Sequence, residues 1–160
     1  MGKFIKGALV TLAASVLGAG AASAATTVTF VEPDKFTDVP FSQIERERVL
    51  KQLQAHVEKL GATLPSGQDL RIEVTDVDLA GITRPTSTRP DLRILNGRAD
   101  WPRITLRYTL EQGGQVLKSG EERIADMNYM QQITPATGDT ALRYEKQMLD
   151  KWFRKTVLGP

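Results

Sequence analysis

The segment 103–117 constrains the fold most, because it alternates strictly between apolar and polar residues and then turns back. Its apolar positions are Ile104, Leu106, Tyr108 and Leu110, with Arg or Thr between them. A period of two is that of a β-strand with one buried face. Gly113-Gly114 supplies the backbone freedom that a tight hairpin turn requires, and Val116-Leu117 begins the return strand. The sequence therefore predicts an antiparallel hairpin.

Three further β elements are indicated. A β-prone run around Val28 and Phe30 stops at Pro33. Residues 70–75 again alternate, but the phase inverts over Asp76–Leu79, which predicts either a bulge or burial of both faces. A second bulge is predicted in the return strand, since Ile124 is out of phase with Leu117 and Gly120 lies between them. A short strand is expected at Leu92–Ile94, within a long loop from Gly81 to Asp100.

Two helices complete the predicted fold. Ser42 and Glu45 form a capping-box pattern before an apolar stripe that ends at Gly61, so a helix is expected over about 43–60. A final helix is predicted from an Asp139 cap to Gly159, with Trp152 in the core. Its apolar face comprises Leu142, Met148, Leu149, Trp152, Phe153 and Val157. The expected class is α+β, with a mostly antiparallel sheet of about four strands and two helices packed on one face.

The N-terminus has the pattern of a secretory signal: basic Lys3 and Lys6, an apolar stretch from Gly7 to Gly20, and Ala22-Ser23-Ala24. We expect residues 1–24 to be a signal peptide and residues 25–160 to form a single α+β domain. A transmembrane anchor is disfavoured because the apolar stretch is shorter than the roughly 20 residues that a bilayer requires. We therefore expect an exported protein of a bacterial periplasm, with no transmembrane helix after cleavage.

Cleavage also changes the charge of the protein. Loss of Lys3 and Lys6 reduces the 21 basic residues to 19, which equals the number of acidic residues. A neutral mature chain does not favour nucleic acid as a partner. The absence of cysteine excludes disulfides, thiolate nucleophiles and cysteine-based metal sites. Only one histidine is present, His56, which lies beside the helical stripe and fits a half-buried structural position. No nucleophile elbow, P-loop or cofactor motif occurs.

An arginine-rich segment is the main candidate binding site. Residues 84–107 contain six arginines and two acids, a local charge of +4. Guanidinium groups suit carboxylate and phosphate, so an anionic envelope ligand or an envelope protein could dock there. The candidate binding residues are Arg84, Arg89, Arg93, Arg98 and Trp101. Trp101 could offer an aromatic platform that Tyr129 and Trp152 extend, although core packing is the alternative for Trp152.

The alternative is that these arginines neutralise the acidic strand that carries Asp69, Glu73, Asp76 and Asp78. We expect a division: Arg103 and Arg107 alternate with core residues and serve the fold, whereas the loop arginines face solvent. The acids themselves allow a second functional hypothesis. Asp76 and Asp78 lie two apart in a strand, and with Asp100 they are candidates for a metal site or an acid–base hydrolase. Pairing with arginines is the alternative for them too.

Four blocks of sequence carry a resemblance to a known family. They are Asp76–Gly81, Asp100–Ile104, Asp126–Tyr129 and Tyr144–Phe153. In this order they resemble the domain of unknown function 3016 family of exported bacterial proteins. The resemblance implies an exported protein of about this length and supplies no catalytic residue. Together the observations favour a non-enzymatic binding or accessory protein over a hydrolase, and they indicate no oligomeric state.

Overall fold

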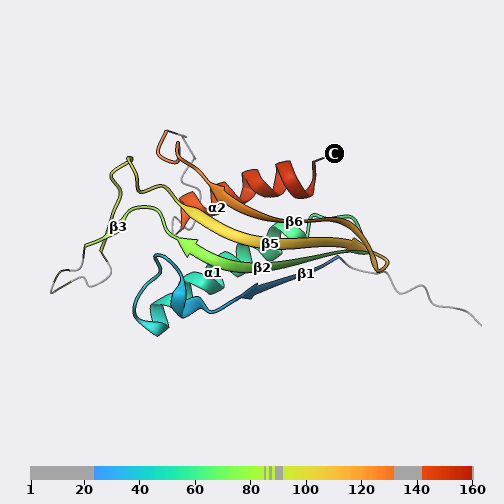
Figure 1. Ribbon diagram of the computed structural model, residues 1–160, viewed down its shortest axis with the longest axis horizontal. Helices are drawn as coiled ribbons and strands as arrows, with labels where there is room; N and C mark the ends of the chain where they lie inside the picture. Colours follow the sequence, from blue (N-terminus) through green and yellow to red (C-terminus); the bar gives the residue numbers. More distant parts are fainter. Residues whose placement is uncertain (1–23, 85, 87, 89–91, 132–141, 160) are drawn as a thin grey trace, which may run out of the picture.

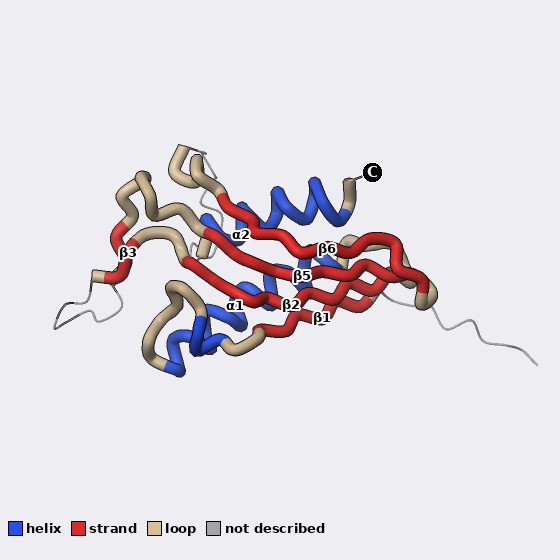
Figure 2. The backbone as a smooth tube through the Cα atoms, in the orientation of Figure 1, coloured by secondary structure: helices blue, strands red, loops and turns tan. Residues whose placement is uncertain are grey.

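The computed structural model describes residues 24–84, 86, 88, 92–131 and 142–159. Its main sheet has four strands in the order β1-β2-β5-β6, with helices α1 and α2 packed on one face (Figures 1 and 2). The strands are β1 (Ala25–Phe30), β2 (Gln68–Asp78), β5 (Arg103–Gln112) and β6 (Gln115–Ala125). β1 pairs parallel to β2 and the other pairs are antiparallel. The predicted α+β class and mostly antiparallel sheet are confirmed.

The predicted bulge in β2 is present, because the β2–β5 register shifts between Val74 and Asp76. The shift keeps Val77 on the buried face. The bulge predicted in β6 lies elsewhere: the register shifts opposite Leu110, where Leu117 is the extra residue. Gly120 stays in register opposite Tyr108, and a Cβ at this glycine would lie 3.1 Å from the Tyr108 ring. The glycine therefore makes room for the tyrosine and does not form the bulge.

Helix α1 (Gln43–Gly61) begins after Ser42, as predicted, but the Ser42 side chain makes no capping hydrogen bond. The predicted capping-box hydrogen bond of Ser42 is therefore absent, and the Glu45 side chain pairs with Arg48 at 2.9 Å. Gly61 does not adopt a left-handed backbone conformation. A Cβ at Gly61 would lie 1.8 Å from Thr26 Oγ1, so the glycine allows the helix end to approach β1 closely.

Helix α2 (Arg143–Trp152) continues into the π-helical turn η2 (Phe153–Val157). Asp139, the predicted cap, lies outside the described residues. Trp152 is only 5% exposed and packs edge-on against Tyr108, so its predicted place in the core is confirmed. Lys118 donates from Nζ to the carbonyl oxygens of the last turn, those of Thr156, Val157 and Gly159. A cation there satisfies carbonyl groups that the helix leaves free.

His56 links the two helices, since its Nε2 lies 2.7 Å from Asp150 Oδ1. Its ring is largely buried, as the sequence predicted for a structural histidine. Within the described residues no helix has the length and apolarity that crossing a membrane requires. The predicted signal peptide falls almost entirely on residues outside the description; β1 begins at Ala25, directly after the predicted cleavage point.

Two short paired strands, β3 (Ile82–Thr83) and β4 (Arg93–Ile94), extend from one end of the sheet (Figure 1). The position of β4 agrees with the short strand predicted at 92–94. A short 3-10 turn, η1 (Pro33–Lys35), follows β1. The β3–β4 hairpin positions the arginines of the candidate site.

Candidate functional site

The four family-like sequence blocks meet at the end of the sheet that carries the β3–β4 hairpin. Direct contacts join them: Ala80 N–H donates to Glu145 Oε1 at 2.8 Å, Gly81 N–H to the Asp100 carbonyl oxygen at 2.8 Å, and Asp126 N–H to the Pro102 carbonyl oxygen at 3.3 Å. The Tyr129 and Tyr144 rings pack edge to face at 4.9 Å. Segments far apart in the chain thus build one cluster.

The side chains of Asp100 and Tyr129 form hydrogen bonds with the backbone of the loop 96–100. The Asp100 carboxylate accepts the Asn96 N–H at 2.6 Å, the Arg98 N–H at 2.9 Å and the Tyr129 O–H at 3.0 Å. Tyr129 Oη in turn accepts the Gly97 N–H at 3.1 Å. Both side chains are buried. Three successive amides of the loop are therefore fixed by two buried side chains.

The ionisation of this pair follows from the contacts. Burial acts to raise the pKa of the Asp100 carboxyl, but the hydrogen bonds from Asn96, Tyr129 and Arg98 outweigh it, so its pKa lies below the usual value. Burial raises the pKa of the Tyr129 hydroxyl, and its bond to Asp100 adds to that increase. The loop is thus fastened by a carboxylate and a neutral phenol.

Arg98 is the exposed charged residue of this loop. A hollow of about 560 Å³ beside it is lined by Ile82, Asn96, Arg98, Ala99 and Asp100. Arg84 is also exposed and continues β3, since its N–H donates to the Leu92 carbonyl oxygen at 2.7 Å. Within the described part of the chain, neither Arg84 nor Arg98 forms an ion pair. Arg89 lies outside the described residues.

Arg93 differs from the other loop arginines. Its guanidinium makes two bonds to the Asp38 carboxylate, at 2.8 and 3.2 Å. It also donates to the carbonyl oxygens of Leu79, Ala80 and Gly81 at 3.4, 3.3 and 3.1 Å. This corrects the expectation that all loop arginines face solvent: Arg93 sits in β4 and ties the hairpin to the body of the protein.

Arg103 pairs with Asp78, its cross-strand neighbour, with a Nε–Oδ2 distance of 2.7 Å. Its guanidinium also lies 5.5 Å from the Trp101 ring centre, so one face of that half-buried ring is covered. Arg107 contacts Glu73 and Glu121, but its side chain is 54% exposed and these pairs are open to solvent. Arg103 and Arg107 both pair with acids of the sheet, as expected. Of these two, Arg103 is the one whose ion pair is shielded from solvent. Tyr129 and Trp152 are core residues and do not extend an aromatic platform.

The three aspartates considered for a metal or hydrolase site do not share partners. Asp76 accepts the backbone N–H and the hydroxyl of Thr37 at 2.7 and 2.8 Å, while Asp78 is bound by Arg103 and Asp100 by its own loop. Among the described residues, no three His, Asp or Glu side chains are grouped so as to hold a metal ion. Pairing with an arginine, the alternative for these acids, is therefore present within the described ranges for Asp78 alone of the three.

Glu145 is a functional candidate that the sequence reasoning missed. It is 3% exposed and borders a pocket of about 180 Å³ with Arg93, Leu95 and Tyr144. Burial raises the pKa of its carboxyl, although the Ala80 N–H and nearby Arg93 act in the opposite direction. The signal was available, because Glu145 is three and four residues before the core positions Met148 and Leu149 and so shares their helix face.

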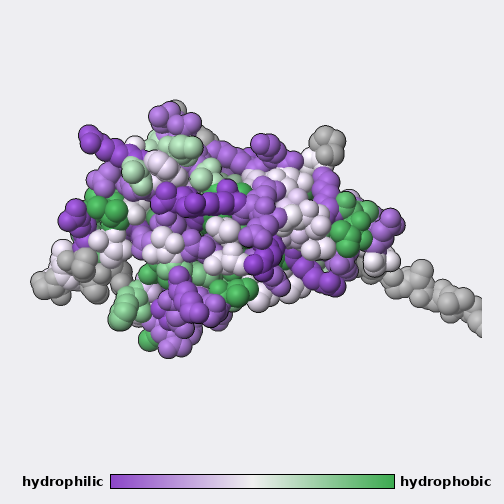
Figure 3. Space-filling view, in the orientation of Figure 1, coloured by the Kyte–Doolittle hydropathy of each residue, from purple (hydrophilic) through white to green (hydrophobic). Residues whose placement is uncertain are grey.

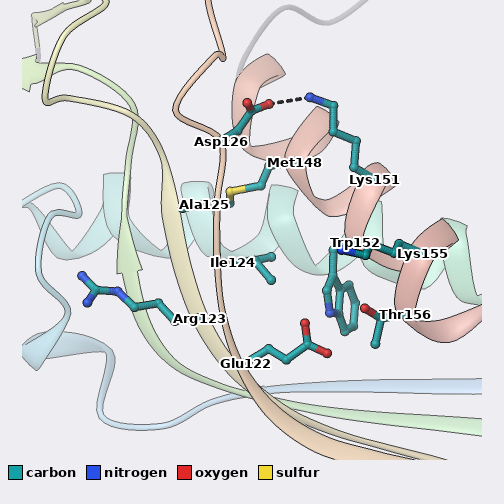
Figure 4. Close-up of a pocket in the computed structure, with 10 residues that line it drawn as sticks. All are labelled: Glu122, Arg123, Ile124, Ala125, Asp126, Met148, Lys151, Trp152, Lys155 and Thr156. Atoms are coloured by element: carbon teal, nitrogen blue, oxygen red, sulfur yellow. Dashed lines mark hydrogen bonds and ion pairs between the residues drawn. The ribbon is translucent and has the colours of Figure 1, made fainter.

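A second groove, of about 550 Å³, lies between β6 and α2 (Figure 4). Glu122 and Ile124 line it from β6, and Trp152, Lys155 and Thr156 line it from the helix and η2. At one end Lys151 pairs with Asp126 at 2.6 Å. No sequence motif pointed to this groove, because its two walls come from segments that local periodicity does not relate.

The protein is of the α+β class. It has a four-stranded mixed sheet, two helices on one face of that sheet, and at one end a loop that carries Arg98 and is fixed by hydrogen bonds. The family model described as protein of unknown function (DUF3016) matches residues 24–155. The chain belongs to this family, as the four sequence blocks indicated. No curated protein matches the chain, and no solved structure does.

Proposed function

We propose that this protein is a non-enzymatic binding or accessory protein of the bacterial periplasm, and that it holds an anionic envelope ligand at the loop 96–100. The observation that carries the proposal is the exposed Arg98 on a loop whose amides are fixed by buried Asp100 and Tyr129. A fixed backbone lowers the entropy that is lost when a ligand is bound. Export is inferred from the leader sequence.

The ligand chemistry follows from the groups around the hollow. Arg98 offers a planar guanidinium for carboxylate, sulfate or phosphate, and Asn96 lies beside it. Ile82 lines the same hollow, and Arg84 follows it by two residues, so both point to one side of the β3 ladder. Figure 3 shows hydrophobic and hydrophilic side chains next to each other at this end of the molecule. Such a surface suits an anion that also carries apolar or sugar groups.

The test is the affinity of the exported protein for soluble polyanions, for which we would use inorganic polyphosphate and a sulfated oligosaccharide. Arg98→Gln should weaken binding by roughly tenfold, as expected for loss of one charge-assisted contact. Arg154→Gln is the matched control, because Arg154 is also an exposed arginine but lies in η2. Equal affinities for the two variants would contradict the proposed site.

A further inference from the structure

Glu122 is a charged residue on the buried side of the sheet. It stands opposite Leu106 in the β5–β6 register, so it shares the inner face with the core residues Leu106 and Ile124. Its side chain is half-buried, and it makes no ion pair or hydrogen bond within the described residues. A carboxylate that is partly removed from water and lacks a partner is unfavourable. The groove is where a partner for it could lie.

The opposite wall of the groove also has unused polar groups. Lys155 is exposed, and Figure 4 shows its side chain extending toward Trp152 at the groove. The indole N–H of Trp152 is buried and has no hydrogen-bond partner among the described residues. Buried donors are nearly always paired in native proteins. Three polar groups from three elements, β6, α2 and η2, therefore surround one groove without hydrogen bonds or ion pairs to the rest of the described residues.

We infer that the groove between β6 and η2 binds a small zwitterion, an unblocked amino acid or short peptide, with its ammonium group at Glu122 and its carboxylate at Lys155. The ligand needs both a positive and a negative group, because Glu122 and Lys155 lie on opposite walls of the groove and do not pair with each other. A ligand that carries a positive and a negative group satisfies both at once.

The remaining charges at the groove support a zwitterion over a simple anion or cation. Asp126 and Lys151 already neutralise each other. Arg123 points away from the groove in Figure 4, as expected for a residue on the outer face of β6. The uncommitted charges are thus one negative and one positive group. The size of the groove, about 550 Å³, is within the range of small-molecule sites.

Trp152 itself provides the readout. In a Trp101→Phe variant it is the one tryptophan left, since the chain has two. We would titrate this variant with glycine, dialanine and trialanine, and with trialanine that is N-acetylated, C-amidated or blocked at both ends. An unblocked ligand should change Trp152 fluorescence with saturation. Blocking either end should weaken binding by roughly tenfold, the effect of one hydrogen bond to a charged group.

Two variants assign the ends of the ligand. Glu122→Gln should bind free and N-acetylated trialanine equally well, and Lys155→Met should no longer distinguish free from C-amidated trialanine. Glu121→Gln and Arg154→Gln are the controls, because Glu121 faces Arg107 on the outer side of the sheet and Arg154 does not line the groove. No saturable change with any unblocked ligand, equal binding of the doubly blocked peptide, or unchanged discrimination in both variants would overturn the inference. The loop at 96–100 takes no part in this test, so its outcome is independent of the proposed anion site.

Discussion

Replacing Asp100 by Asn should loosen the loop that carries Arg98. Oδ1 of Asp100 accepts the Arg98 N–H and the Tyr129 O–H, and Oδ2 accepts the Asn96 N–H. An asparagine keeps one acceptor oxygen but places an NH₂ group against another donor. A hydrogen bond to a charged acceptor contributes about 1.5–3 kcal/mol, and an unsatisfied buried donor costs about 1–3 kcal/mol. Asp100→Asn should therefore lower the free energy of unfolding by about 3 kcal/mol.

The assay is denaturant unfolding of both proteins across acidic pH. Because the pKa of Asp100 is lower in the folded state, its stabilising contribution is present above about pH 4, the ordinary carboxyl value, and is lost as pH falls through the folded pKa. The variant should lack this part of the acid dependence. Tyr129→Phe should be less destabilising in the Asp100→Asn background, since the two residues share one bond. A loss below about 1 kcal/mol at neutral pH would refute the reasoning.

Four other predictions concern single residues and the leader. Arg93→Gln should destabilise the protein by about 2 kcal/mol or more in denaturant unfolding because it frees a half-buried carboxylate, whereas Arg98→Gln should change stability by less than about 0.5 kcal/mol; the reverse order would contradict the assigned contacts. Trp152→Ala should cost about 3 kcal/mol or more, and a loss below about 1 kcal/mol would mean that the indole is not packed in the core. Glu145 has a raised pKa, so its stabilising contribution is complete below the ordinary carboxyl value and declines as pH rises through the folded pKa; thermal unfolding of Glu145→Gln should lack this decline, and parallel pH profiles would count against it. Amino-terminal sequencing of the exported protein should begin at Ala25, and Met1 in a membrane fraction would refute cleavage.

The sheet was predictable because its signal is local. Strict alternation over 103–110 predicted β5. The phase change after Val74 predicted either a bulge or burial of both faces, and the bulge is what β2 has. The apolar face of the last helix likewise placed Trp152 in the core. The β6 bulge was expected near Gly120 because a glycine in a strand suggests irregularity. This glycine instead makes room for the Tyr108 ring on the neighbouring strand. A cross-strand requirement of that kind leaves no periodic signal.

The sequence predicted which residue types belong to the candidate site, but it did not predict which partners these residues bind. The sequence singled out the arginines, yet it could not separate Arg93 from Arg98. The partner of Arg93 is Asp38, which lies 55 residues away on a loop near β2. In the same way Tyr129 reaches Asp100 across 29 residues. Such contacts depend on how the sheet and hairpin bring distant segments together, which charge counting along the chain does not reveal.

The central claim is that an anionic ligand binds at the loop 96–100, and amide NMR of the protein tests it most directly. During titration with inorganic polyphosphate, the largest shifts should occur at Asn96, Gly97 and Arg98, and Arg98→Gln should suppress them. The amides of the basic α2–η2 segment should change little. Shifts centred on Lys151–Lys155, with the 96–100 amides unmoved, would contradict the account.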